Sequence, residues 1–170
     1  MAESSTFSRG WLHNQVGIRV SDLEKSLFFY EAVLGMQVLT RISSDTLSLV
    51  LLGYPEGGGP EKALSREGVL ELSWSEHTQK SVTHGTQHPE CGLLKLAFSV
   101  PDLAACISRL KEHGVKVLKE PGTSDGVGEV AQALGFEPPE KGRNKGIWEF
   151  IQGVAFAQDP DGYLLELIQY

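Results

Sequence analysis

The chain has 170 residues, of which 41% are hydrophobic and 22% charged, and this composition is typical of a folded globular protein. Its formal net charge of −7 excludes nucleic acid as an expected partner, because phosphate binding needs clustered lysines and arginines. No apolar run approaches the roughly 20 residues that cross a bilayer, and neither a signal peptide nor metal-type cysteine spacing is evident. We therefore expect a cytoplasmic protein whose partner is a small molecule.

The first predicted elements are a strand over residues 14–20 and a helix after it. Asp22 is suited to cap the start of this helix, and Gly35 is suited to end it. The helix is indicated by apolar residues at helical spacing, which are Leu23, Leu27, Tyr30 and Leu34. Three more strands are expected over residues 36–41, 47–52 and 69–74, with a proline- and glycine-rich turn at residues 54–60.

The second half of the chain repeats this order. Residues 98–103 resemble residues 18–23 at an offset of 80, so a strand is expected over residues 93–100 and a helix between Asp102 and Gly114. Further strands are expected over residues 115–118, 154–157 and 164–168. The run Asp159-Pro160-Asp161-Gly162 predicts a hairpin turn before the last of them.

The order βαβββ, found twice, predicts an α+β fold of paired βαβββ modules. We place the modules at residues 11–80 and 92–170, with a flexible N-terminus at residues 1–10 and a long loop at residues 119–150. A doubly wound parallel sheet is the alternative, but it requires strands and helices to alternate throughout the chain.

Four polar residues occupy equivalent positions in the two copies. Gln15 corresponds to Lys95, and Glu71 corresponds to Glu166 on the last strand of each copy. Because side chains alternate along a strand, both glutamates point away from their leucine neighbours toward a concave polar face. Each glutamate could simply face solvent. Their matched placement favours one shared site, since a buried carboxylate must be paired, hydrogen-bonded or metal-bound.

Together these segments resemble glyoxalase I, the lactoylglutathione lyase of the vicinal oxygen chelate superfamily, over nearly the whole chain. The resemblance implies the paired βαβββ fold and a homodimer in which a site forms within one chain or across two. Its most specific pieces are residues 15–20, Val33-Leu34-Gly35-Met36, Leu70-Glu71-Leu72, Val100-Pro101-Asp102, residues 153–156, residues 159–163 and Leu165-Glu166-Leu167.

The resemblance also implies a zinc or nickel ion held by two glutamates, a glutamine and a histidine, with the last glutamate moving a proton. Glu166 matches that glutamate, Gln15 and Glu71 match two other ligands, and Lys95 stands at the position of the histidine. A protonated lysine has no lone pair to give a metal. The site is therefore either metal-free, with the Lys95 ammonium in place of the ion, or an incomplete metal site of Gln15, Glu71 and Glu166.

The expected substrate differs from that of the family. Arg19 matches the arginine on the family's first strand, but Glu90 and Phe150 stand near positions where the resemblance implies cations. We therefore expect no glutathione binding. The loop at residues 119–150 is interpreted as a lid, in which Trp148 and Phe150 either line the pocket of an aromatic substrate or anchor the loop.

The sequence thus predicts a lyase or isomerase in which Glu166, Lys95 and Glu71 are catalytic. Its substrate would be a small carbonyl or aromatic polyketide-like compound of secondary metabolism, bound by Arg19, Gln15, Trp148 and Phe150. One alternative is a glutathione-dependent lactoylglutathione lyase. Another is a protein that binds a small molecule without catalysis. His84 and His88 either reach the site or have no role in it.

Overall fold

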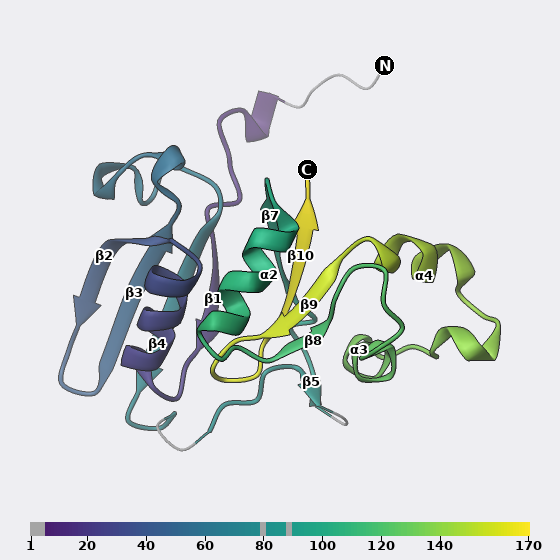
Figure 1. Cartoon of the computed structure of the whole chain (residues 1–170). Coiled ribbons are helices and arrows are strands. Elements are labelled where there is room, and N and C mark those ends of the chain that lie inside the picture. Colours follow the sequence, from purple (N-terminus) through teal and green to yellow (C-terminus); the bar gives the residue numbers. More distant parts are fainter. Residues whose placement is uncertain (1–5, 79–80, 88–89) are drawn as a thin grey trace. The chain divides into compact units, whose positions relative to one another are not determined.

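The computed structural model describes residues 6–78, 81–87 and 90–170, and it divides the chain into two compact units (Figure 1). The first unit is Met1–Lys80 and the second is Ser81–Tyr170. Each unit contains a four-stranded sheet, and each is described by itself below. Over the described residues, no helix combines the length and the apolar character needed to span a bilayer.

The first unit is built on a mixed sheet in the order β1-β4-β3-β2. Strands β1 and β4 are parallel, whereas β4 with β3 and β3 with β2 are antiparallel. Short 3-10 helices at Thr6–Ser8, Pro55–Gly57 and Pro60–Lys62 lie outside the sheet. The strands are β1 (Gln15–Arg19), β2 (Gln37–Ser43), β3 (Leu47–Gly53) and β4 (Val69–Ser75).

The helix of the first unit begins and ends as predicted, but it is not a regular α-helix. The Asp22 side chain accepts a hydrogen bond from the Lys25 backbone N–H at 3.1 Å, and Gly35 has a φ of 76°. Helix α1 (Leu23–Leu27) continues directly as a π-helix over Phe28–Val33. Leu27 and Tyr30 of the predicted stripe are buried, with Phe29 and Val33 buried beside them, whereas Leu23 and Leu34 are half-buried.

The second unit repeats the arrangement in a sheet of order β7-β10-β9-β8. Asp102 caps the helix α2 by accepting a hydrogen bond from Ala105 N–H at 2.9 Å, and the predicted hairpin turn connects β9 with β10. The paired βαβββ organisation is therefore confirmed. The elements are β7 (Leu96–Val100), α2 (Leu103–Glu112), β8 (Val117–Lys119), β9 (Ala155–Gln158) and β10 (Leu164–Gln169), with a small ribbon of β5 (Thr86–Gln87) and β6 (Glu90–Cys91) before them.

Residues 119–150, called the insert below, were expected to form a long loop but hold two α-helices. Helices α3 (Val127–Leu134) and α4 (Lys145–Gln152) are joined through a 3-10 helix at Pro139–Lys141. Their apolar side chains join a buried cluster with the sheet, so the segment is packed onto the second unit and is not an open lid. The buried residues of this cluster are Leu118, Val127, Val130, Ala131, Trp148, Ile151, Val154, Phe156 and Leu164.

A buried lysine connects the end of α4 to the sheet. Lys119, at the end of β8, is only 2% exposed. Its ammonium group donates to the backbone carbonyls of Ile151 at 2.9 Å, Glu120 at 3.0 Å and Val154 at 3.1 Å. Burial lowers the pKa of Lys119, and the three carbonyl dipoles compensate for the desolvation of its charge.

Candidate functional site

In the first unit, Gln15 and Glu71 form a hydrogen-bonded pair on neighbouring parallel strands. Gln15 Nε2 donates to Glu71 Oε2 at 2.8 Å. Gly17, two residues after Gln15 on β1, is the register partner of Glu71 on β4. A Cβ atom at Gly17 would lie 3.3 Å from Glu71 Oε1. The missing side chain at Gly17 therefore leaves the carboxylate its space beside β1.

Only the nitrogen atom of the Gln15 side-chain amide has a hydrogen-bond partner in the part of the chain that the structure describes. Its Oε1 atom is buried and has no hydrogen-bond partner among the described residues. A buried acceptor without a partner is unfavourable, and it is stabilised by a donor or a cation. The Gln15–Glu71 pair is thus suited to hold a polar hydrogen or a positively charged group of a ligand.

In the second unit, Lys95 and Glu166 form an ion pair. Lys95 Nζ lies 2.6 Å from Glu166 Oε2, and the two side chains are 30% and 4% exposed respectively. Lys95 was expected within a strand but directly precedes β7, whose Ala97 is the register partner of Glu166. This register matches Gly17 and Glu71 in the first unit, as the offset of 80 residues predicts.

The face of the second sheet that carries Glu166 is less polar than predicted. Leu164 shares this face by alternation along β10, and Phe156 is the register partner of Glu166 on β9. Both belong to the buried cluster that α3 and α4 complete, with Trp148 among its members. Glu166 is therefore shielded from water by apolar neighbours, while Lys95 is the accessible member of the ion pair.

The remaining predicted residues lie in different surroundings. Arg19 shares the face of Gln15 by alternation along β1 and is exposed. Trp148 is buried and donates from Nε1 to the Glu137 carbonyl at 3.1 Å, so it anchors the insert, whereas Phe150 is 61% exposed on α4. These positions favour the anchoring alternative for Trp148 over a direct contact with substrate.

Of the two histidines considered from the sequence, His84 packs in the second unit and His88 lies outside the described residues. His84 is buried, and its Nδ1 lies 2.8 Å from Thr86 Oγ1. Its ring meets Tyr163 edge-on at 6.2 Å and also lies against Gly162 in the hairpin turn. This packing gives His84 a structural role at the turn before β10.

Within either unit alone, the residues do not form the metal site that the resemblance implies. Over the ranges that the structure describes, no group of three or more His, Cys, Asp or Glu side chains is placed to hold a metal. Gln15 and Glu71 offer oxygen atoms, but Glu166 is already neutralised by an ammonium group that cannot act as a ligand. We derive no chemical step through a metal.

Comparison with known proteins relates the chain to one enzyme family. Residues 13–167 match the model of the Glyoxalase/Bleomycin resistance protein/Dioxygenase superfamily. A lactoylglutathione lyase of Pseudomonas aeruginosa is 31% identical over 98% of this chain and 87% of its own length. A lactoylglutathione lyase of Schizosaccharomyces pombe is 30% identical over 91% of this chain, which spans about half (46%) of that longer relative.

Solved structures agree with this relationship. The glyoxalase I of Leishmania major, described as trypanothione-dependent, has a TM-score of 0.62 and 27% identity, and the match covers 94% of this chain and 86% of that one. Glyoxalase I of Zea mays also has a TM-score of 0.62, at 25% identity, over 92% of this chain and 44% of the maize chain. The family and the α+β fold predicted from sequence are confirmed. The chain belongs to the glyoxalase/bleomycin resistance protein/dioxygenase superfamily.

Proposed function

We propose that this chain is a glyoxalase I-type enzyme that moves a proton between adjacent carbons of a small 2-oxo compound. The observation that carries the proposal is the Lys95–Glu166 ion pair, in which a shielded carboxylate touches an accessible ammonium group. The relatives named lactoylglutathione lyase favour the glutathione hemithioacetal of methylglyoxal as the substrate. They support this alternative better than the expectation that glutathione is not used.

The two members of the pair have complementary roles in such a reaction. The Glu166 carboxylate accepts a proton from the carbon next to the carbonyl, and the electron pair of that C–H bond moves to the carbonyl oxygen. The Lys95 ammonium then stabilises the resulting enolate oxygen, because a cation placed beside a developing negative charge lowers its energy. Glu166 then returns its proton to the neighbouring carbon, and the hydroxyl proton of the first carbon moves to the former carbonyl oxygen, which gives the thioester and completes the isomerisation.

In this proposal, Lys95 supplies the positive charge at Glu166 that a divalent ion would otherwise supply. Gln15 and Glu71 form a second polar pair, and Arg19 on the same strand face as Gln15 is suited to a substrate carboxylate. We assign Glu71 to the catalytic set with Glu166 and Lys95, and we assign Gln15 and Arg19 to substrate binding.

The proposal is tested by following thioester formation from the hemithioacetal of methylglyoxal and glutathione. Assays run with a chelator and with added zinc or nickel. We expect turnover that chelation leaves unchanged, and we expect Glu166→Gln to lower kcat by about 100-fold or more. Lys116→Met, which removes an exposed ion pair with Glu129, is the control and should keep full activity. Full activity of Glu166→Gln would refute the role of Glu166, and dependence on added metal would refute that of Lys95.

A glutathione-free carbonyl substrate is the second candidate. It is favoured by Phe150, which is exposed on α4 near a position where the family resemblance implies a cation for glutathione. Supplying the same 2-oxoaldehyde with and without the thiol separates the two candidates. Turnover of the free aldehyde alone would select the second candidate. Saturable binding with no turnover of either compound would select the non-catalytic alternative.

A further inference from the structure

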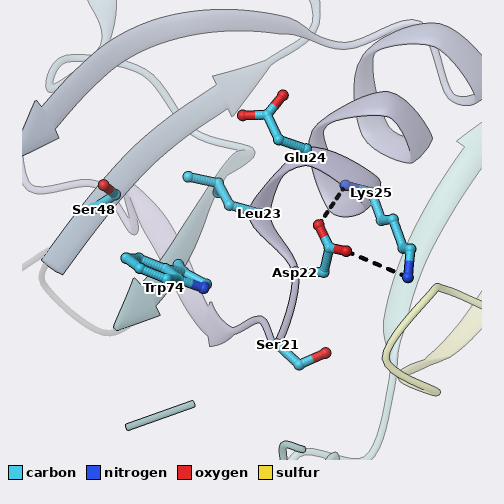
Figure 2. A pocket seen from close by; sticks show the side chains of 7 residues that line it. All are labelled: Ser21, Asp22, Leu23, Glu24, Lys25, Ser48 and Trp74. Atoms are coloured by element: carbon cyan, nitrogen blue, oxygen red, sulfur yellow. Dashed lines mark hydrogen bonds and ion pairs between the residues drawn. The ribbon is translucent and has the colours of Figure 1, made fainter. Parts of the chain in front are cut away.

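The first unit contains a pocket that the proposed chemistry does not use. Its volume is about 660 Å³, and Figure 2 shows the side chains around it. It lies where β1 ends and α1 begins, beside the first residues of β3 and the last residues of β4. The residues that line it are Ser21, Asp22, Leu23, Glu24, Lys25, Ser48 and Trp74.

This pocket is on the opposite side of the sheet from the Gln15–Glu71 pair. Along β4, Trp74 alternates with Ser73 and Ser75, which share the face of Glu71. Ser48 is the register partner of Trp74 on β3, so both side chains point to the helix side of the sheet. A ligand held here would not contact Gln15 or Glu71 in the same unit.

The charged groups of the pocket are not balanced. Asp22 is engaged twice with Lys25, through its backbone N–H at 3.1 Å and its ammonium group at 3.3 Å, and these contacts with Lys25 lower the pKa of Asp22. The Glu24 carboxylate has no hydrogen bond or ion pair within the described part of the chain. The side chains that line the pocket therefore carry one net negative charge, in a chain whose formal net charge is −7.

Trp74 gives the pocket an aromatic surface that can bind a cation. Its indole is half-buried and lies beside Leu23 and Ser48 in Figure 2. The face of an aromatic ring attracts cations, and among aromatic residues Trp attracts them most strongly. Quaternary ammonium groups are bound in this way. A neutral sugar could also stack on Trp74, but it would gain nothing from the Glu24 charge.

We propose that the Trp74 pocket binds a small organic ammonium ion, with the indole of Trp74 against its alkyl groups and the Glu24 carboxylate balancing its charge. Because the pocket is open to solvent, we expect a Kd on the order of millimolar. This binding site is independent of the proposed reaction, and either can be correct without the other.

The test is a titration of the full chain with choline, followed by the indole N–H signals in ¹H–¹⁵N spectra. The sequence has three tryptophans, so Trp11 and Trp148 serve as internal references. The variant Trp74→Phe identifies the Trp74 signal by its loss. We expect choline to shift the Trp74 signal saturably and to leave the references unchanged. Its uncharged isostere 3,3-dimethylbutan-1-ol should shift the Trp74 signal at least fivefold less at equal concentration.

Variants of two acidic residues separate a specific site from general charge attraction. Glu24→Gln should weaken choline binding several-fold, whereas Glu56→Gln, which removes an exposed charge elsewhere in the first unit, should leave it unchanged. The proposal is wrong if choline causes no saturable shift, or if the neutral isostere or glucose shifts the signal equally. Equal binding by Glu24→Gln and the wild type would also overturn it.

Discussion

Replacing Lys95 by methionine should lower the free energy of unfolding by about 1–3 kcal/mol. The substitution keeps most of the aliphatic stem but removes the ammonium group that lies 2.6 Å from Glu166 Oε2. Removing one member of a fully buried ion pair costs about 3–5 kcal/mol, because the other charge is left uncompensated. The Glu166 side chain is 4% exposed, but that of Lys95 is 30% exposed, so water can partly replace the ammonium and the expected cost is smaller.

Urea unfolding with a matched control isolates this effect from general loss of charge. Lys116 and Glu129 form an ion pair at 3.1 Å in the same unit, with side chains that are 62% and 60% exposed. Lys116→Met should therefore change the free energy of unfolding by less than about 1 kcal/mol. A double-mutant cycle with Glu166→Gln should give a coupling energy of at least about 1 kcal/mol. A coupling energy near zero, or equal costs for both lysine variants, would refute the assignment of a shielded pair.

Three further outcomes are expected. Lys119→Ala should lower the free energy of unfolding, measured in urea, by about 2–4 kcal/mol, because it removes three hydrogen bonds and leaves a cavity. An effect below about 1 kcal/mol would show that these hydrogen bonds do not stabilise the insert. Gly17→Ala should lower kcat/KM several-fold with little change in Tm, since its Cβ would press on Glu71 Oε1. Burial raises the pKa of the Cys106 thiol, so in a Cys91→Ser background alkylation at pH 8 should be slower than that of free cysteine.

Features that depend on neighbouring residues were predictable from the sequence. Asp22 and Asp102 cap their helices through bonds to residues three positions later, and each geometry needs only a short side chain next to a helical run. The π-helix was not predictable in this way. Apolar residues at α-helical spacing give no signal of the wider turn over Phe28–Val33.

The helices at residues 119–150 were not predicted, although the positions of two glycines indicate one of them. Gly126 and Gly135 lie at the two ends of α3 with left-handed φ values of 75°, where glycine supports a helix instead of breaking it. Val127, Val130 and Ala131 have the spacing of a buried helical face. The signal for α3 was therefore present in the sequence, whereas the hydrogen bonds of Lys119 depend on carbonyls more than 30 residues away.

The equivalent positions of the candidate residues were predictable because the two copies repeat at a fixed offset. An offset of 80 residues relates Gln15 to Lys95 and Gly17 to Ala97, and the structure places Glu71 opposite Gly17 and Glu166 opposite Ala97. That the two pairs serve one substrate stays a prediction. The Trp74 pocket gave no sequence signal, since a tryptophan on a strand is equally typical of packing and of a binding wall.

The difference between the two glutamates follows from how strongly each is desolvated. Glu71 is half-buried and its partner is the neutral amide of Gln15, whereas Glu166 is buried beside Phe156 and Leu164 and its partner is an ammonium group. A more deeply buried carboxylate needs a stronger partner, because neutral hydrogen bonds alone do not replace its lost hydration. The inserted helices α3 and α4 complete the apolar cluster around Phe156 and Leu164, and the first unit has no counterpart of these helices over its described residues. A segment inserted into one copy has therefore made two equivalent acids unequal, and this inequality is the physical reason to assign proton transfer to Glu166.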